Sequence, residues 1–137
     1  MPFENKIAIV IKDDLQHWQK LNVASFLASS VAVRFPETHG QPFVNASNSE
    51  FLPFIKQPML IYKADDPSQL DRAFRRAKER DLHIGVFTSP LFLTKNEVEN
   101  HLEIGKTTDE SQDLAGIVIY GENKKVNKAL NGLKFHD

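Results

Sequence analysis

Apolar runs alternate with amphipathic stretches along the chain, and this alternation predicts strands separated by helices. Residues 6–12 form a continuous apolar run flanked by lysines, which is typical of a central strand covered on both faces. Similar runs predict three more strands and a short closing edge strand, at residues 59–63, 82–87, 114–120 and 133–135. The strands therefore belong to one sheet with buried centre strands.

Helical spacing of apolar residues predicts a helix after each of the four longer strands. The first, at residues 19–33, is apolar almost all round, so we expect it to be sandwiched between other elements. For the others we predict N-caps at Asp66, at Thr94 with Glu97 as a capping box, and at Asn123. The first of these helices should end near Asp81. The other two should run through about Ile104, closed by Gly105, and through Leu130, with Gly132 as the stop.

The segment between the first helix and the second strand contains four prolines and Gly40, which break helical periodicity. Within it, residues 41–45 and 50–54 can pair as a hairpin around the turn 46–49. Residues 1–137 have the length of one domain. We therefore predict a three-layer α/β sandwich with a mixed sheet of four to five strands and helices on both faces.

Charge, cysteine content and the lengths of the apolar runs exclude several classes of function. The net charge is −1 and the isoelectric point is near 6.5, so bulk charge attracts neither nucleic acid nor an anionic membrane. The chain has no cysteine, which excludes disulfides and thiolate chemistry, and nowhere do eighteen apolar residues occur together. We expect a cytoplasmic protein without a membrane span, and no local spacing predicts a metal or cofactor site.

The turn between the first strand and the first helix holds the main candidate binding residues. Lys20 with nearby backbone amides could hold a phosphate or carboxylate, or it is a solvated lysine at a helix start. Asp14 orders the turn or caps the helix, and His17 is either a proton carrier or a surface histidine. Trp18 could cover a pocket mouth or meet another subunit.

A second set of candidates lies on the predicted third helix. Thr94 has a structural role as the N-cap, whereas Asn100 or His101 could line a pocket that faces the first helix, or face water. Two basic groups could follow nucleic-acid phosphates or form solvated faces, and neither carries interleaved stacking aromatics. They are Arg72, Arg75, Arg76, Lys78 and Arg80, and Lys124, Lys125, Lys128 and Lys134.

The opening of the chain resembles the type II peptidyl-tRNA hydrolases in residues 6–11, in Asp14 with Leu15, and in Lys20 followed by a helix of small residues. Later segments are similar to that family's remaining elements in the same order: 59–63, the helix from Asp66, 114–120 and 131–135. The chain is more similar still to a bacterial family of unknown function in the same superfamily, through 39–42, 92–94, Asn100, Gly121 and 126–133. The resemblance implies the family's α/β fold and, as for related domains, a homodimer.

The hydrolase signature in the first helix is only partly present. Lys20 and Ala28 match it, but other residues replace its glycine, two alanines, glutamine and histidine: Gln19, Asn22, Val23, Ala24 and Leu27. The family's Asp-Ala-Gly cluster has no counterpart in residues 87–90. Ester hydrolysis needs a base together with an oxyanion stabiliser, and a charged lysine supplies only the second.

Three hypotheses follow. The first is a hydrolase-like protein that binds a small anionic or nucleotide-like ligand near Asp14, Trp18 and Lys20 without the usual catalytic set. The second is an active peptidyl-tRNA hydrolase with a rearranged site. The third, which the resemblance implies for related domains, is a homodimeric interaction module that uses Trp18 and apolar helix surface.

Overall fold

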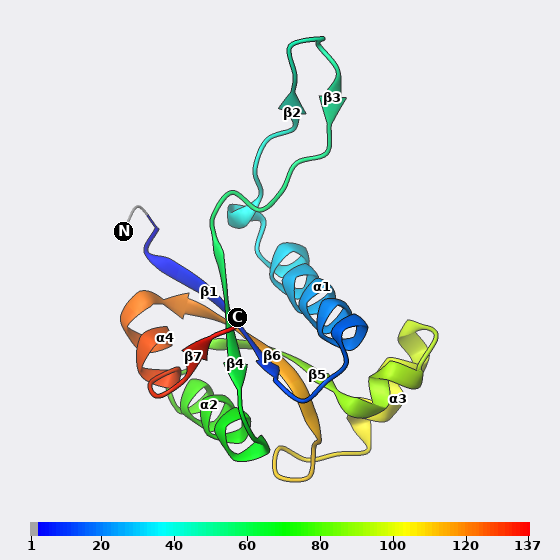
Figure 1. Cartoon of the computed structure of the whole chain (residues 1–137), viewed down its shortest axis with the longest axis vertical. Helices are drawn as coiled ribbons and strands as arrows, with labels where there is room; N and C mark the ends of the chain where they lie inside the picture. Colours follow the sequence, from blue (N-terminus) through cyan, green and yellow to red (C-terminus); the bar gives the residue numbers. More distant parts are fainter. Residues whose placement is uncertain (1–2) are drawn as a thin grey trace.

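Five strands form one mixed sheet in the order β5-β6-β1-β4-β7 (Figure 1). The computed structural model describes residues 3–137. The strands are β1 Asn5–Lys12, β4 Met59–Ala64, β5 His83–Thr88, β6 Leu114–Glu122 and β7 Lys134–Phe135. β1 and β4 are parallel, and the other neighbouring pairs are antiparallel. The prediction of a mixed sheet with helices on both faces is confirmed.

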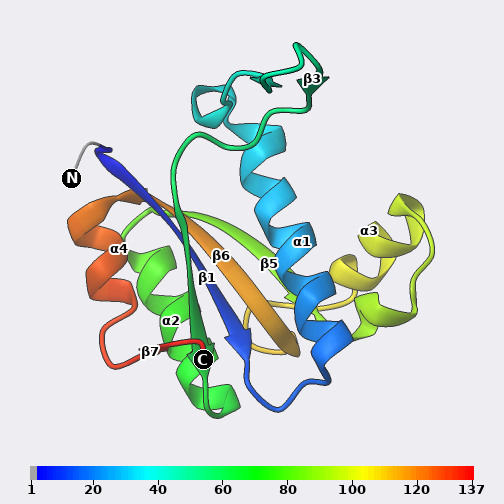
Figure 2. The ribbon, with the colours of Figure 1, turned by 45° about the horizontal axis from the view of Figure 1, so that its top comes forward.

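Helices cover the two faces of this sheet unequally (Figure 2). α2 Pro67–Glu79 and α4 Asn123–Ala129 lie together on one face, which we call the closed face. α1 His17–Arg34 lies on the other, which we call the open face, and contacts β6, β1 and β5. α3 Glu97–Gly105 follows the short 3₁₀ helix η2 Ser89–Leu93 and stands beside α1.

The closed face is a continuous apolar core. The buried side chains of α2 recur at helical spacing, at Leu70, Ala73, Phe74 and Ala77. They pack with Val126, Ala129 and Leu130 from the α4 region and with the alternate strand residues Ala8, Val10, Ile117 and Ile119. Asp66 caps α2 as predicted, because its side chain accepts a hydrogen bond from the backbone N–H of Gln69 at 3.0 Å.

On the open face, α1 buries only Val23, Leu27 and Val31 against the sheet. A side chain at Gly116 would place its Cβ 2.6 Å from a methyl group of Val23, so the glycine lets α1 approach β6 closely. The expectation that α1 is sandwiched is wrong. No second layer covers it within residues 3–137, and Leu21, Phe26 and Val33 are 70%, 57% and 83% exposed.

Three helix starts differ from the predictions. α1 begins at His17 after the N-cap Gln16, whose backbone N–H donates to Gln19 Oε1 at 3.0 Å. α3 is capped by Asn96 rather than by Thr94, since the Asn96 side chain accepts from the Glu99 N–H at 2.9 Å. α4 follows Glu122. Asparagine and threonine both favour caps, so the pattern alone did not decide between Thr94 and Asn96.

The predicted hairpin is confirmed and forms an arm that stands away from the sheet (Figure 1). It follows the 3₁₀ helix η1 Pro36–Thr38 and pairs β2 Phe43–Val44 with β3 Glu50–Phe51 in antiparallel register. Asn45 closes the turn, because its side-chain oxygen accepts from the N–H groups of Ser47 and Ser49. We refer to residues 41–54 as the arm, and every one of them is exposed.

Candidate functional site

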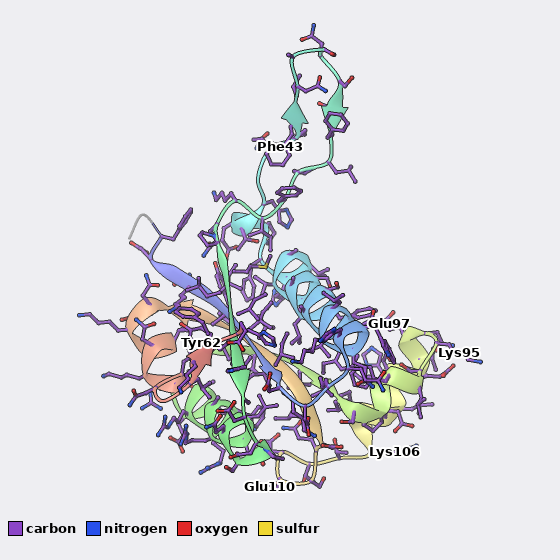
Figure 3. All side chains as sticks on the ribbon, viewed as in Figure 1. Phe43, Tyr62, Lys95, Glu97, Lys106 and Glu110 are labelled. Atoms are coloured by element: carbon purple, nitrogen blue, oxygen red, sulfur yellow. The ribbon has the colours of Figure 1, made fainter. Side chains whose placement is uncertain are left out.

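An open groove of about 840 Å³ runs between α1 and α3. Its floor comes from β5 and η2, and its walls come from one flank of α1 and the inner side of α3. Lys95 and Glu97 lie where the chain enters α3 (Figure 3). The size lies within the range of small-molecule sites in proteins.

Aromatic rings line the groove in a connected row. Trp18 meets Phe92 edge-on with ring centroids 5.9 Å apart, and Phe92 lies 4.9 Å from Phe87. Phe87 in turn lies 6.0 Å from Phe26 on α1. Trp18 is 52% exposed and Phe26 is 57% exposed, so both rings offer free surface to the groove. Such a row suits a flat apolar or aromatic ligand.

A hydrogen-bonding pair faces this aromatic row. The Thr94 hydroxyl contacts the amide oxygen of Asn100 and the Leu91 carbonyl, the latter at 2.9 Å. Because one hydroxyl donates a single hydrogen bond, it serves one of these acceptors at a time. The Asn100 amide NH₂ has no hydrogen-bond partner within residues 3–137, so it can donate to a ligand. Asn100 thus offers both a donor and an acceptor beside the rings.

The charges around the groove do not favour an anion at the start of α3. Glu97 and Glu99 occupy the first turn of this helix, where they already interact with its positive end. His101 Nε2 lies 3.3 Å from Glu97, and both side chains are largely exposed. Lys95 provides a cation at the rim. The groove therefore offers rings and neutral hydrogen-bonding groups rather than a basic cradle.

Lys20 lies on the opposite flank of α1, away from the groove. Its ammonium is 3.1 Å from Asp13 Oδ1 and 3.1 Å from His136 Nε2, and its side chain is only 15% exposed. The hydrogen bond from Lys20 lowers the pKa of Asp13 below its ordinary value of 3.8. Because a lysine ammonium can only donate, His136 Nε2 accepts here, and Nδ1 carries the proton and donates to the Asp137 carbonyl at 3.1 Å.

The predicted site residues therefore divide among three places. Trp18, Thr94 and Asn100 come together in the groove. Lys20 belongs to the cluster with Asp13 and His136. Asp14 is exposed and lies 3.7 Å from Lys12, and His17 is exposed at the first residue of α1. Asp14 does not cap α1, because Gln16 holds that position.

Sequence reasoning missed the rest of both clusters. Phe26 lies eight residues after Trp18, and this spacing would have placed both rings on one flank of the helix. Phe87 and Phe92 come from a strand and a 3₁₀ turn, and His136 is 116 residues from Lys20, so no local pattern relates them. In the basic groups, Arg76 donates to the Asn131 carbonyl and Lys78 pairs with Asp109.

Together these features define an α/β protein with a half-covered mixed sheet, an aromatic groove and a protruding hairpin arm. A family model described as "Protein of unknown function (DUF2000)" matches residues 5–137. The chain belongs to this DUF2000 family.

A solved structure with the same architecture is that of the protein of unknown function Atu0240 from Agrobacterium tumefaciens strain C58. The two sequences are 28% identical, the match covers 98% of this chain and 99% of that one, and the TM-score is 0.94. No curated protein matches the chain. Neither match links the chain to the peptidyl-tRNA hydrolases, so that resemblance stays a prediction. Within residues 3–137, no helix has the length and apolar character needed to cross a membrane.

Proposed function

We propose that the protein binds a small nucleotide-like molecule in the groove between α1 and α3. The flat ring of the ligand lies against Trp18 and Phe26, and its hydrogen-bonding edge meets Asn100. The ligand class is the one predicted from sequence, but the proposed binding site is the groove rather than the surroundings of Lys20. The observation that supports it is that Trp18 from α1 meets Thr94 and Asn100 from the α3 region in one groove.

The chemistry of the lining supports a ring with polar edges. Stacking on exposed aromatic rings tolerates any flat base, because each base presents a π-face. A carboxamide offers one acceptor and two donors, which is the pattern that base edges require. Since the start of α3 already carries two acidic residues, we expect the nucleoside part to contribute more affinity than a phosphate.

Trp18 gives a direct readout because it is the single tryptophan of the chain. The experiment titrates the protein with adenosine, guanosine, cytidine, uridine and their 5′-monophosphates while Trp18 fluorescence is recorded. We expect saturable quenching by at least one nucleoside. Asn100→Leu should weaken that binding roughly tenfold, because the edge of the ligand loses its partner. The matched control Asn131→Leu changes an exposed asparagine outside the groove and should bind like the wild type.

Absence of saturable quenching with all of these compounds would overturn the proposal. So would equal binding by the Asn100→Leu and Asn131→Leu variants, because the groove would then not be the binding site. Circular dichroism of both variants confirms that they are folded.

The Lys20 cluster favours a second candidate function, hydrolysis of the ester bond of peptidyl-tRNA by a rearranged site. His136 Nε2 can act as a general base once its hydrogen bond from Lys20 is broken, and the freed Lys20 ammonium can then stabilise the oxyanion that develops. The test is a cleavage assay on acylated tRNA, with Lys20→Ala and with Lys106→Ala as the control on an exposed lysine. Turnover that is lost only in Lys20→Ala supports this function, and no turnover in the wild type excludes it.

A further inference from the structure

The arm carries several large apolar side chains that residues 3–137 leave exposed. Phe43, Val44, Phe51, Leu52 and Phe54 are 48%, 61%, 53%, 85% and 72% exposed. Figure 3 shows Phe43 on the stem of the arm, clear of the sheet and its helices. Glu50 is the single charged residue between positions 41 and 54, whereas 26% of the whole chain is charged. Depletion of charge with aromatic enrichment is the composition of an interface core.

The arm has few stabilising contacts of its own beyond its root. Its ladder consists of two paired positions, and Phe43 packs on Phe54 at 4.7 Å between ring centroids. An isolated two-stranded hairpin is at best marginally stable. An apolar arm of this kind needs a surface from another molecule to cover it.

Part of β4 on the open face is also apolar and only partly covered, so it could pack against an apolar arm. Met59 and Ile61 on β4 lie opposite Ile7 and Ile9 of β1, so their side chains point to the α1 side of the sheet. They are 39% and 38% exposed, because α1 packs on β1, β5 and β6.

The neighbouring flank of α1 faces this part of β4. Lys20 contacts His136, whose backbone N–H donates to the Ile61 carbonyl at 2.9 Å. Leu21, the next residue on that flank, is 70% exposed. We refer to Leu21, Met59 and Ile61 as the strip. The remaining side chains of this flank are small, at Ala24, Ala28 and Ala32, so a second chain can approach the helix closely.

We propose that two copies of this chain form a symmetric dimer in which the arm of each copy packs on the strip of the other. Continuity argues for a second copy as the partner. The arm leads directly into β4, since only four residues lie between Phe54 and Met59. In a two-fold dimer, one continuous patch must supply both the donor and the acceptor surface, and the joined arm and strip meet this requirement.

The area of the arm also fits a stable dimer. At roughly 200 Å² for each large side chain and the exposures above, one arm offers about 600 Å² of apolar surface. At the same area for each side chain, the strip of one copy offers about 300 Å². Two arms and two strips then bury about 1,800 Å², which matches the roughly 1,600 Å² of a standard stable interface.

A matched pair of leucines tests the role of the arm. Leu52 on the arm and Leu93 in η2 are both 85% exposed, so Leu52→Ser and Leu93→Ser remove the same side chain at the same exposure. Sedimentation velocity of the wild type at micromolar concentrations should show a dimer. Leu52→Ser should weaken the dimer by roughly a hundredfold, because the change occurs twice in a symmetric pair, and Leu93→Ser should not weaken it.

A mixing experiment tests the arm-to-strip geometry. One variant replaces residues 42–53 with two glycines, above the root that is held by the Gly40 N–H to Phe54 carbonyl bond and the pairing of His39 with Ile55. The other carries Leu21→Glu with Met59→Glu. Each variant alone has no intact arm-to-strip contact and should be monomeric. Their equimolar mixture retains one intact contact and should form a mixed dimer.

Three results would overturn the proposal. They are a monomeric wild type, a dimer that survives removal of the arm, and a mixture that stays monomeric although both variants are folded by circular dichroism. The last result would show that the arm and the strip do not contact each other.

Discussion

The two faces of the sheet differ in how completely this chain covers them. On the closed face, α2 and α4 leave Leu70, Phe74 and Val126 buried, and neither helix has an exposed large apolar side chain. On the open face, α1 buries three residues and exposes Trp18, Leu21, Phe26 and Val33. The difference lies in the helices that pack on each face, since α2 and α4 together cover the closed face and α1 packs on the open face.

The closed face contributes to the stability of the fold, whereas the open face carries the surfaces available for binding. The closed face completes its core within the chain, and we expect substitutions there to affect the free energy of unfolding alone. On the open face, exposed aromatic and aliphatic side chains occupy the groove, the arm and the strip. Large uncovered apolar surfaces of this kind mark interaction sites.

The largest expected effect concerns the closed face. Leu70 is 1% exposed in its core, and Leu70→Ala should lower the free energy of unfolding by about 3 kcal/mol through lost burial and the cavity left behind. Leu21→Ala on the open face should change the stability of the monomer by less than about 0.5 kcal/mol. Denaturant titration below the concentration of dimer formation measures both. Equal losses would break the distinction between the faces.

A smaller effect is expected where α1 meets the sheet. Gly116→Ala places a Cβ 2.6 Å from Val23 and 2.9 Å from the Val10 carbonyl, and should cost about 1–3 kcal/mol. Gly105→Ala is the matched control, since its Cβ has no neighbour within 4 Å and a helical alanine stabilises by about 0.5–1 kcal/mol. Thermal unfolding should therefore shift in opposite directions for the two variants. Shifts in the same direction would show that α1 is not seated closely on β6.

Tyr120 reports how well the open-face core excludes water. Burial raises its pKa above the ordinary value of 10.0, and the carboxylate of Glu37, 3.2 Å from its hydroxyl, acts in the same direction. A raised pKa means that the unfolded chain ionises first. Stability should therefore fall as the pH rises above 10.0. Ultraviolet titration of a Tyr62→Phe variant, which leaves one tyrosine, should give a midpoint above 10.0, and a midpoint at or below that value would contradict this.

The smallest effect concerns Asp13 at the edge of the open face. Since the hydrogen bond from Lys20 lowers its pKa, the ion pair stabilises the fold above pH 3.8 and is lost as the pH falls through the lower folded value. Asp13→Asn should be slightly less stable than the wild type at neutral pH, and the gap should close in acid. We would measure melting temperatures across the acid range. A difference in melting temperature that grows in acid would contradict the lowered pKa of Asp13.

Much of the fold could be predicted because its central strands are continuous apolar runs. The run 114–120 is buried throughout, as expected for a central strand that is covered on both faces of the sheet. The cap of α1 was missed because Gln16 is not among the side chains that commonly cap helices. The exposure of Leu21 and Phe26 was missed because an apolar helix position does not tell whether its cover comes from the same chain.

The candidate sites were predictable only in part. Trp18 and Asn100 were chosen individually, but their meeting depends on how α3 returns to α1, which no local spacing encodes. The contact of Lys20 with His136 depends on β7 pairing beside β4. Long-range sheet order therefore decides which of the predicted residues share a site.

The most direct test compares amide hydrogen exchange in the wild type with that in the Leu21→Glu, Met59→Glu variant at a concentration where the wild type dimerises. The account predicts that amides in the arm and in β4 exchange more slowly in the wild type, by a larger factor than those of α2 and α4, which gain only the global stability that dimer formation adds. Equal exchange in the arm of the two proteins would contradict the claim that the open face is covered by a second molecule.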